Sequence, residues 1–322
     1  MAIFVQIIIF CASVAIVWFF AGMLIESVNR IAQRYCKTGF FTAFFILGAL
    51  TSISEFSVAL NSTLVSVPAV SVGNLTGASL VVMLFIVPLL AVAGKGIALN
   101  SAVSHRGLFA ILAVIALPVL LASDGDVTRS EGLLSLLAYG AVAFALYRRR
   151  RAINSCDPEA LSLSTAKPLM ADFGRIILGA IAIFAAAHFL VEEAVFFAGV
   201  LEIPVSIVAL LLLSIGTNIP EIVIAFRAVL SGRSDIAFGD YLGSAAMNTL
   251  IFAFLALLNG KFLLESRGFL VTAVVTVLGL GFLYVFARTK AALSRGEGAA
   301  LLLFYAAFLV LQIVNVFLLS GR

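Results

Sequence analysis

Charged residues and cysteines are scarce in this chain of 322 residues. Asp, Glu, Lys and Arg make up only 11% of the sequence, whereas 63% is hydrophobic, and the mean hydropathy is +1.20. The three cysteines, Cys11, Cys36 and Cys156, are too few and too scattered for a disulfide framework or a metal-ligand spacing. A soluble core does not need so much apolar sequence. The composition therefore predicts an integral membrane protein.

Long apolar runs indicate how the chain crosses the membrane. Runs of about 20 residues span the roughly 30 Å hydrocarbon layer as helices, and the alternating, turn-separated strands of a membrane β-barrel are absent from the sequence. We predict an all-α polytopic membrane protein with about ten transmembrane helices. The expected spans are 2–24, 39–63, 68–92, 107–123, 131–147, 174–199, 203–230, 235–258, 263–287 and 299–320. No basic residue precedes the first run, which predicts a retained span rather than a cleaved signal peptide.

A polar stretch that begins with the arginine run Arg148–Arg151 separates two apolar halves. We divide the chain into a first five-helix repeat (1–147), a cytoplasmic linker (148–173) and a second five-helix repeat (174–322). With this linker in the cytoplasm, all but four of the 20 Lys and Arg residues lie on the cytoplasmic side. The positive-inside rule then places both termini on the non-cytoplasmic side. We expect the plasma (inner) membrane, with membrane lipids and no nucleic acid as partners, because the basic residues follow the topology.

An offset of 166 residues aligns the two halves without gaps. It pairs residues that are mostly polar or glycine, namely Glu26 with Glu192, Thr51 with Thr217, Glu55 with Glu221, Gly73 with Gly239 and Gly77 with Gly243. Each half holds five expected spans, an odd number, so the second copy enters the membrane from the opposite side. We therefore predict inverted repeats, an architecture of secondary transporters whose ion sites lie near the midplane.

Two matching acidic segments, T-S-I-S-E ending at Glu55 and T-N-I-P-E ending at Glu221, lie inside apolar runs. A charged side chain near the bilayer centre costs at least about 2.5 kcal/mol, so an acid there is a candidate functional residue. In each segment Thr and Glu are four residues apart and share one helix face. If both faces meet, their carboxylate, hydroxyl and carbonyl oxygens suit Ca²⁺, and Na⁺ can use many of them. Pro220 frees a backbone carbonyl that can line a cavity.

A second pair of segments follows the acidic ones. G-N-L-T-G-A begins at Gly73, and G-D-Y-L-G-S-A-A-M-N begins at Gly239. Their glycines are expected to allow close helix packing. In the second copy Ser244 and Asn248 are four residues apart and present two neutral oxygen ligands on one face, whereas the first copy has Ala78 and Val82 at these positions.

These motifs resemble the alpha repeats of the calcium/cation antiporter superfamily, which includes sodium/calcium exchangers. The segments G-T-N-I-P-E and G-D-Y-L-G-S-A-A-M-N resemble the second repeat, and T-S-I-S-E with G-N-L-T-G-A resembles a divergent first repeat. The resemblance covers essentially the whole chain. It implies a core of eight helices with two more mobile ones, and exchange of Ca²⁺ for Na⁺ or H⁺ by alternating access without a cofactor. It also implies metal ligands at Thr51, Ser52, Glu55, Thr217, Asn218, Glu221, Ser244 and Asn248.

Several positions depart from the family pattern. Leu50 replaces a Gly, Ser54 replaces a Pro, and Ala78 and Val82 replace polar residues. A Ca²⁺ site with two carboxylates survives these changes, but the set of Na⁺ ligands is reduced. Coupling to H⁺ is therefore the alternative, because two adjacent carboxylates can titrate at separated pH values and one could carry a proton. A membrane-embedded hydrolase is not expected, because the acids lie in a duplicated frame without a recognisable protease signature.

Other polar residues have simpler interpretations. Ser244 and Asn248 could serve only as interhelical hydrogen-bonding groups. His188 and Glu192 are four residues apart and are expected to form a polar pair near the outer membrane face, with proton transfer as the alternative. Asp240 stands where the family motif has Asn, and we expect it to start a helix or to accept a hydrogen bond rather than to bind an ion. The sequence does not indicate an oligomeric state.

Overall fold

The computed structural model describes residues 2–34, 43–94, 96–98, 103–153, 169–222, 225, 234–264, 269–290 and 292–320. The chain is helical, which confirms the predicted fold class. The long helices are α1 (Ala2–Arg34), α7 (His105–Leu121), α8 (Arg129–Ile153), α9 (Leu169–Leu201), α13 (Ser234–Asn259), α14 (Phe269–Lys290) and α15 (Arg295–Ser320). The first half also contains η1 (Ala43–Leu47), α3 (Gly48–Thr51), α4 (Ile53–Leu64), α5 (Pro68–Leu80), η2 (Val81–Ile86), α6 (Val87–Ala93) and η3 (Ala122–Asp124). The second half adds α10 (Val205–Val208), η5 (Ala209–Leu213) and α11 (Ser214–Thr217).

Within the described residues, eight helices are long and apolar enough to cross a membrane. A ninth span is possible if Phe44–Thr51 and Ile53–Leu64 count as one, although the two parts are bent by 48°. The remaining predicted span, 203–230, is represented by the shorter apolar helix Val205–Thr217, and much of the rest lies outside the described residues. The prediction of about ten spans is thus matched in eight or nine positions.

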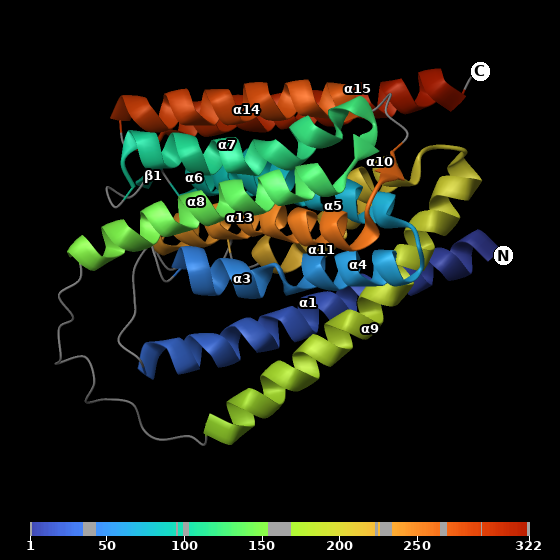
Figure 1. The fold of residues 1–322 in the computed structure, drawn as a ribbon, viewed down its shortest axis with the longest axis horizontal. Helices are drawn as coiled ribbons and strands as arrows, with labels where there is room; N and C mark the ends of the chain where they lie inside the picture. The colour runs from blue at the N-terminus through green and yellow to red at the C-terminus, as the bar shows by residue number, and fades with distance from the viewer. Residues whose placement is uncertain are drawn as a thin grey trace.

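The helices α5 and α13 form the centre of the bundle, and α1 and α9 lie together along one edge (Figure 1). The most apolar stretch of Pro68–Ala93 has 83% of its residues buried. The corresponding share for Phe238–Asn259 is 72%. The corresponding share for Ile3–Leu24 is only 17%. Both termini lie at one end of the bundle, whereas α8 ends and α9 begins at the other end. Two polar-rich helices therefore run through the middle of the bundle, where lipid cannot reach them.

Two short antiparallel strand pairs join the halves of the chain. β1 (Ile97–Ala98) pairs with β4 (Ala292–Leu293), and β2 (Asp126–Val127) pairs with β3 (Phe262–Leu263). Each pair takes one strand from each half. Because β1 and β2 flank α7, the two pairs tie the halves together at opposite ends of that helix.

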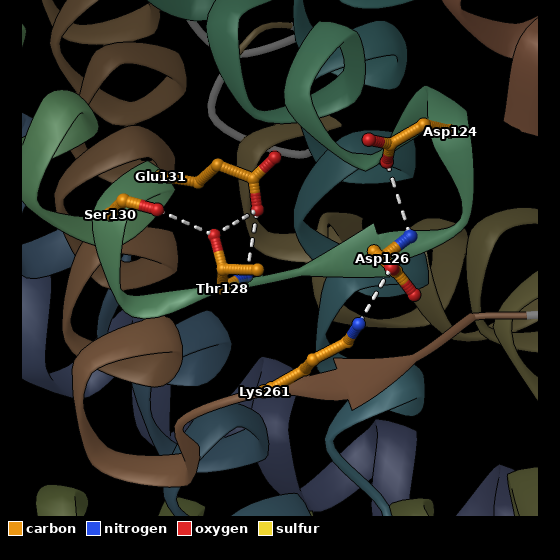
Figure 2. A network of polar contacts seen from close by, with 6 residues as sticks. All are labelled: Asp124, Asp126, Thr128, Ser130, Glu131 and Lys261. Atoms are coloured by element: carbon orange, nitrogen blue, oxygen red, sulfur yellow. Dashed lines mark hydrogen bonds and ion pairs between the residues drawn. The ribbon is translucent and has the colours of Figure 1, made fainter.

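Polar side chains surround the β2–β3 pair (Figure 2). The Lys261 ammonium lies 3.0 Å from an Asp126 carboxylate oxygen, and the Thr128 amide and hydroxyl donate to Glu131 Oε2 at 2.6 and 2.9 Å. This last arrangement caps the start of α8. Ser294 and Glu297 cap α15 in the same way, with Ser294 N donating to Glu297 Oε2 at 2.8 Å.

The local structure repeats at the offset of 166 residues. The π-helical segment 43–47 recurs at 209–213, the short helix 48–51 recurs at 214–217, and β2 at 126–127 recurs as β4 at 292–293. The two caps follow the same offset, because Thr128 corresponds to Ser294 and Glu131 to Glu297. The duplication inferred from the sequence is therefore visible in the backbone. The opposite membrane orientation of the two copies stays a prediction.

Candidate cation-binding site

Both acidic segments contain a break in a helix, and each glutamate lies directly after the break. Glu55 is in the first turn of α4, and Glu221 is in the helical turn 219–222. Ser52 separates α3 from α4 with φ −79° and ψ 8°, and Asn218 follows α11 with φ −96° and ψ 9°. The first break forms without a proline, so Pro220 alone does not explain the second one. Broken helices at membrane depth are tolerated where they are buried in protein or line a cavity.

Side chains that bond to the preceding turn occur at both breaks. Ser52 Oγ donates to the Gly48 carbonyl at 2.8 Å, and Asn218 Nδ2 donates to the Ser214 carbonyl at 2.7 Å. The Thr51 and Thr217 hydroxyl oxygens lie 3.3 Å from the same two carbonyl oxygens. Such bonds from a side chain to the carbonyl one turn back bend helices. The motif residues therefore shape the backbone as well as offering oxygens.

Glycines let the helix that follows each acidic segment touch the other copy. A Cβ atom at Gly77 would collide with the Leu210 carbonyl, and one at Gly243 would collide with the Phe44 carbonyl. Leu210 and Phe44 are themselves related by the offset of 166, so the two contacts are equivalent. The predicted packing role of these glycines is confirmed. Their close contacts place α5 against η5 and α13 against η1, on either side of the acidic segments.

Polar contacts link the two copies directly at the centre. The Ser52 and Ser244 hydroxyl oxygens are 3.3 Å apart, and Asn218 Nδ2 donates to Glu55 Oε1 at 3.4 Å. Ser54 Oγ donates to the other oxygen of Glu55 at 2.8 Å. Both carboxylate oxygens of Glu55 thus have a hydrogen-bond donor.

Glu221 is in a different environment, although it is equally buried. Only 1% of either glutamate is exposed, yet neither carboxylate oxygen of Glu221 has a hydrogen-bond partner. The two carboxylates lie within electrostatic reach of each other. Leaving a buried acceptor without a partner costs about 1–3 kcal/mol, and more for a charged group. Buried polar groups without a partner are uncommon in proteins, and this marks Glu221 as a candidate ligand.

The structure brings together most of the residues that the sequence selected. All eight candidate ligands are at most 3% exposed, namely Thr51, Ser52, Glu55, Thr217, Asn218, Glu221, Ser244 and Asn248. Asn248 is the least closely associated with the glutamates, because its Nδ2 donates to Ser79 Oγ at 3.1 Å and to the Leu75 carbonyl at 3.4 Å, both in α5. Its Oδ1 is buried without a partner. The counterparts Ala78 and Val82 are buried and apolar.

Carboxylates alone do not form a metal site in the part of the chain that the structure describes. No group of three or more His, Cys, Asp or Glu side chains there could hold a metal ion. A cation between Glu55 and Glu221 would therefore also need hydroxyl, amide or carbonyl oxygens. Ca²⁺ typically takes six to eight oxygen ligands of these mixed types.

Sequence reasoning did not select Asn74, which lies next to the candidate ligands, and one of its two interpretations of Asp240 is wrong. The Thr217 hydroxyl donates to Asn74 Oδ1 at 3.3 Å, which places this unselected Asn beside the centre. Asp240 lies inside α13 rather than at its start, so the helix-start interpretation is wrong, and it accepts a hydrogen bond from Thr51 as the other interpretation expected. The offset of 166 relates the two contacts, because 74 and 51 correspond to 240 and 217, so either contact predicts the other.

The second polar constellation lies on α9, away from this centre. His188 Nε2 is 3.3 Å from Glu192 Oε1, with 43% and 54% of the two side chains exposed, so the predicted pair is present. The neighbouring Glu193 is only 4% exposed, and its Oε2 has no partner. Within the described residues, His188, Glu192 and Glu193 form no hydrogen bond with the candidate ligands.

Fold and centre together define a polytopic α-helical membrane protein with a buried polar site between duplicated, broken helices. The chain belongs to the sodium/calcium exchanger protein family, whose model matches residues 5–148 and 172–314.

Individual relatives agree with this membership. The sodium/calcium exchanger MaX1 of Methanosarcina acetivorans is 36% identical over 143 residues, which are 43% of this chain and 40% of MaX1. The inner membrane protein YrbG of Escherichia coli is 27% identical over 209 residues, or 62% of this chain and 63% of YrbG. Each alignment thus spans less than two thirds of the relative.

A solved structure shows the fold over nearly the whole length. The sodium–calcium exchanger NCX_Mj, soaked with Na⁺ and Sr²⁺, superposes with a TM-score of 0.67 at 18% identity. The superposition covers 96% of this chain and 99% of that one.

Proposed function

We propose that this protein is a secondary antiporter that exchanges Ca²⁺ for Na⁺ by alternating access, at a site built from Glu55 and Glu221. The observation that carries the proposal is the buried Glu221 carboxylate, which has no protein partner and lies within electrostatic reach of Glu55. The family, and the name of the relative MaX1, support Na⁺ and Ca²⁺ as the transported ions.

The charges of the site explain why transport is coupled. Two carboxylates match the charge of one Ca²⁺, and the hydroxyls of Thr51, Thr217 and Ser52 with the amide oxygen of Asn218 supply neutral ligands. Without cations, the two carboxylates repel each other inside a bundle that excludes water. The protein therefore changes between its two access states when the site is filled and not when it is empty. Exchange is the result, rather than a leak of either ion.

The decisive experiment measures uptake of radiolabelled Ca²⁺ into proteoliposomes with Na⁺ and H⁺ gradients imposed separately. An outward Na⁺ gradient is expected to drive uptake, whereas a pH gradient in Na⁺-free medium is not. Uptake driven only by the pH gradient and unaffected by Na⁺ would establish the H⁺-coupled alternative.

Variants test the assignment of the site. Glu55→Gln and Glu221→Gln each remove one of the two charges and are expected to abolish exchange. Glu202→Gln changes an exposed glutamate at the end of α9 and serves as the matched control, with exchange expected at the wild-type rate. Normal Ca²⁺ flux in either of the first two variants would contradict the site.

A further inference from the structure

Asp240 is a third buried carboxylate, next to the candidate ligand Thr51, and the proposed exchange does not use it. It lies inside α13, is 5% exposed, and accepts a hydrogen bond from Thr51. Its Oδ1 has no hydrogen-bond partner. The hydroxyl of the next residue, Tyr241, donates to the Glu221 carbonyl at 3.4 Å, so this part of α13 packs against the segment that carries Glu221. Among the described residues, no Lys, Arg or His forms an ion pair with either carboxylate.

The first copy of the repeat provides an internal comparison. Asn74 corresponds to Asp240, and Thr217 corresponds to Thr51. The Thr217 hydroxyl donates to Asn74 Oδ1 at 3.3 Å, so the contact of Thr51 with Asp240 is the same contact with a carboxylate in place of an amide. The substitution keeps the hydrogen bond and adds a negative charge.

This added charge makes the two sides of the centre unequal. On one side Glu55 accepts hydrogen bonds from Ser54 and Asn218, and the Asn74 side chain that contacts Thr217 is neutral. On the other side Glu221 has no donor, and its neighbour Asp240 is acidic. Unpaired buried charge is expensive unless a counter-charge is present. Three carboxylate oxygens without partners, two from Glu221 and one from Asp240, therefore point to a cation on this side.

We propose that Asp240, Glu221 and Thr51 form a second cation subsite, which takes one Na⁺ beside the Ca²⁺ site. This inference rests on the proposed function. A monovalent ion fits the charge, because Glu55 and Glu221 already balance one Ca²⁺ and Asp240 adds a single negative charge. The subsite also offsets the loss of polar ligands at Ala78 and Val82 in the first copy. The subsite is next to Ser244, which lies four residues after Asp240 in α13.

The subsite predicts how many Na⁺ ions take part in exchange. Asp240→Asn restores the amide found at Asn74 and removes one charge without changing the size of the side chain. This variant is expected to lower the Hill coefficient for Na⁺ in Na⁺-driven Ca²⁺ transport by about one. It is also expected to lower the charge moved per Ca²⁺ by one elementary charge, measured as current from the same proteoliposomes. Asp126→Asn, at an aspartate on β2 whose side chain is 39% exposed, is the control and keeps both values.

The reverse substitution in the first copy tests whether one added carboxylate raises the number of Na⁺ ions that take part in exchange. Asn74→Asp places a carboxylate next to Thr217 and is expected to raise the Hill coefficient for Na⁺ by about one. If Asp240→Asn does not yield folded protein, this variant decides the question. Unchanged Na⁺ dependence in the folded variants would overturn the inference.

A separate readout distinguishes this inference from the proposed function. Exchange of radiolabelled Ca²⁺ for unlabelled Ca²⁺ requires the Ca²⁺ site and no Na⁺. Its absence in the wild-type protein would refute the proposed function. Its presence, together with an identical Na⁺ response in wild type and Asp240→Asn, would refute only the second subsite.

Discussion

Hydrogen bonding differs between the two central glutamates, although they occupy equivalent positions in the repeat. Ser54 and Asn218 donate to the two oxygens of Glu55, whereas Glu221 has no donor. A donor bonded to a carboxylate reduces the gain from adding a cation, because part of the coordination is already satisfied. Glu221 should therefore contribute more than Glu55 to the stabilisation that a bound cation provides.

Binding of Ca²⁺ should be measurable as thermal stabilisation. A ligand at about 100 times its dissociation constant stabilises the folded state by about 2.7 kcal/mol. We expect Ca²⁺ to raise the melting temperature of the detergent-solubilised wild type, and Glu221→Gln to lose this shift. Glu202→Gln, which changes an exposed glutamate, should keep it. A full Ca²⁺ shift in Glu221→Gln would show that the ion binds elsewhere.

Sequence reasoning identified the residues of the centre better than their contacts. The two glutamates stood out as acids in apolar runs, and the resemblance to the antiporter superfamily implied the full set of eight candidate ligands, all of which are buried. The contact between Thr217 and Asn74 was not found, because it joins residues 143 positions apart and depends on how α11 packs against α5. The sequence also did not predict that the Glu221 carboxylate oxygens have no partner, because this depends on which hydrogen-bond donors reach the carboxylate in the folded protein.

At the scale of helices, the motif segments are less regular than hydropathy suggested. The predicted spans are continuous, but residues 43–47 and 209–213 are π-helical and each acidic segment contains a break. A π-helical turn depends on the helix that packs against it, which hydrophobic periodicity does not record. The copies also differ here, because 81–86 is π-helical whereas its counterpart 247–252 lies inside the helix α13. This difference begins next to Val82, where the first copy lacks a polar ligand.

Helix contact at the repeat interface should depend on single glycines. Gly243→Ala places a methyl group against the Phe44 carbonyl and forces α13 away from η1. Overpacking of this kind costs about 1–3 kcal/mol, so we expect a lower melting temperature and weaker Ca²⁺ exchange. Gly140→Ala in α8 is the matched control, because no atom lies within 4 Å of the added Cβ. Equal stability of the two variants would contradict the close contact.

At the scale of the whole molecule, the strand pairs connect some of the helices but not α1 and α9. The strand pairs β1–β4 and β2–β3 tie one half of the chain to the other at opposite ends of α7. α1 and α9 lie outside these ties and pack on each other along one edge (Figure 1). The resemblance to calcium/cation antiporters implied a core of eight helices and two more mobile ones. We therefore predict that α1 and α9 are that pair, because moving them along the core breaks neither strand pair.

The ends of the bundle give the last prediction, the orientation in the membrane. Asp124, Asp126 and Glu202 lie near the end that carries both termini, whereas Arg106, Arg288 and Arg295 flank the β1–β4 pair at the other end. Positively charged residues next to spans favour the cytoplasmic side. With the native cysteines replaced by serine, a single cysteine at Glu202 should react in intact cells with a membrane-impermeant thiol reagent. A cysteine at Arg106 should react only after the membrane is opened, and the reverse pattern would mean that the termini are cytoplasmic.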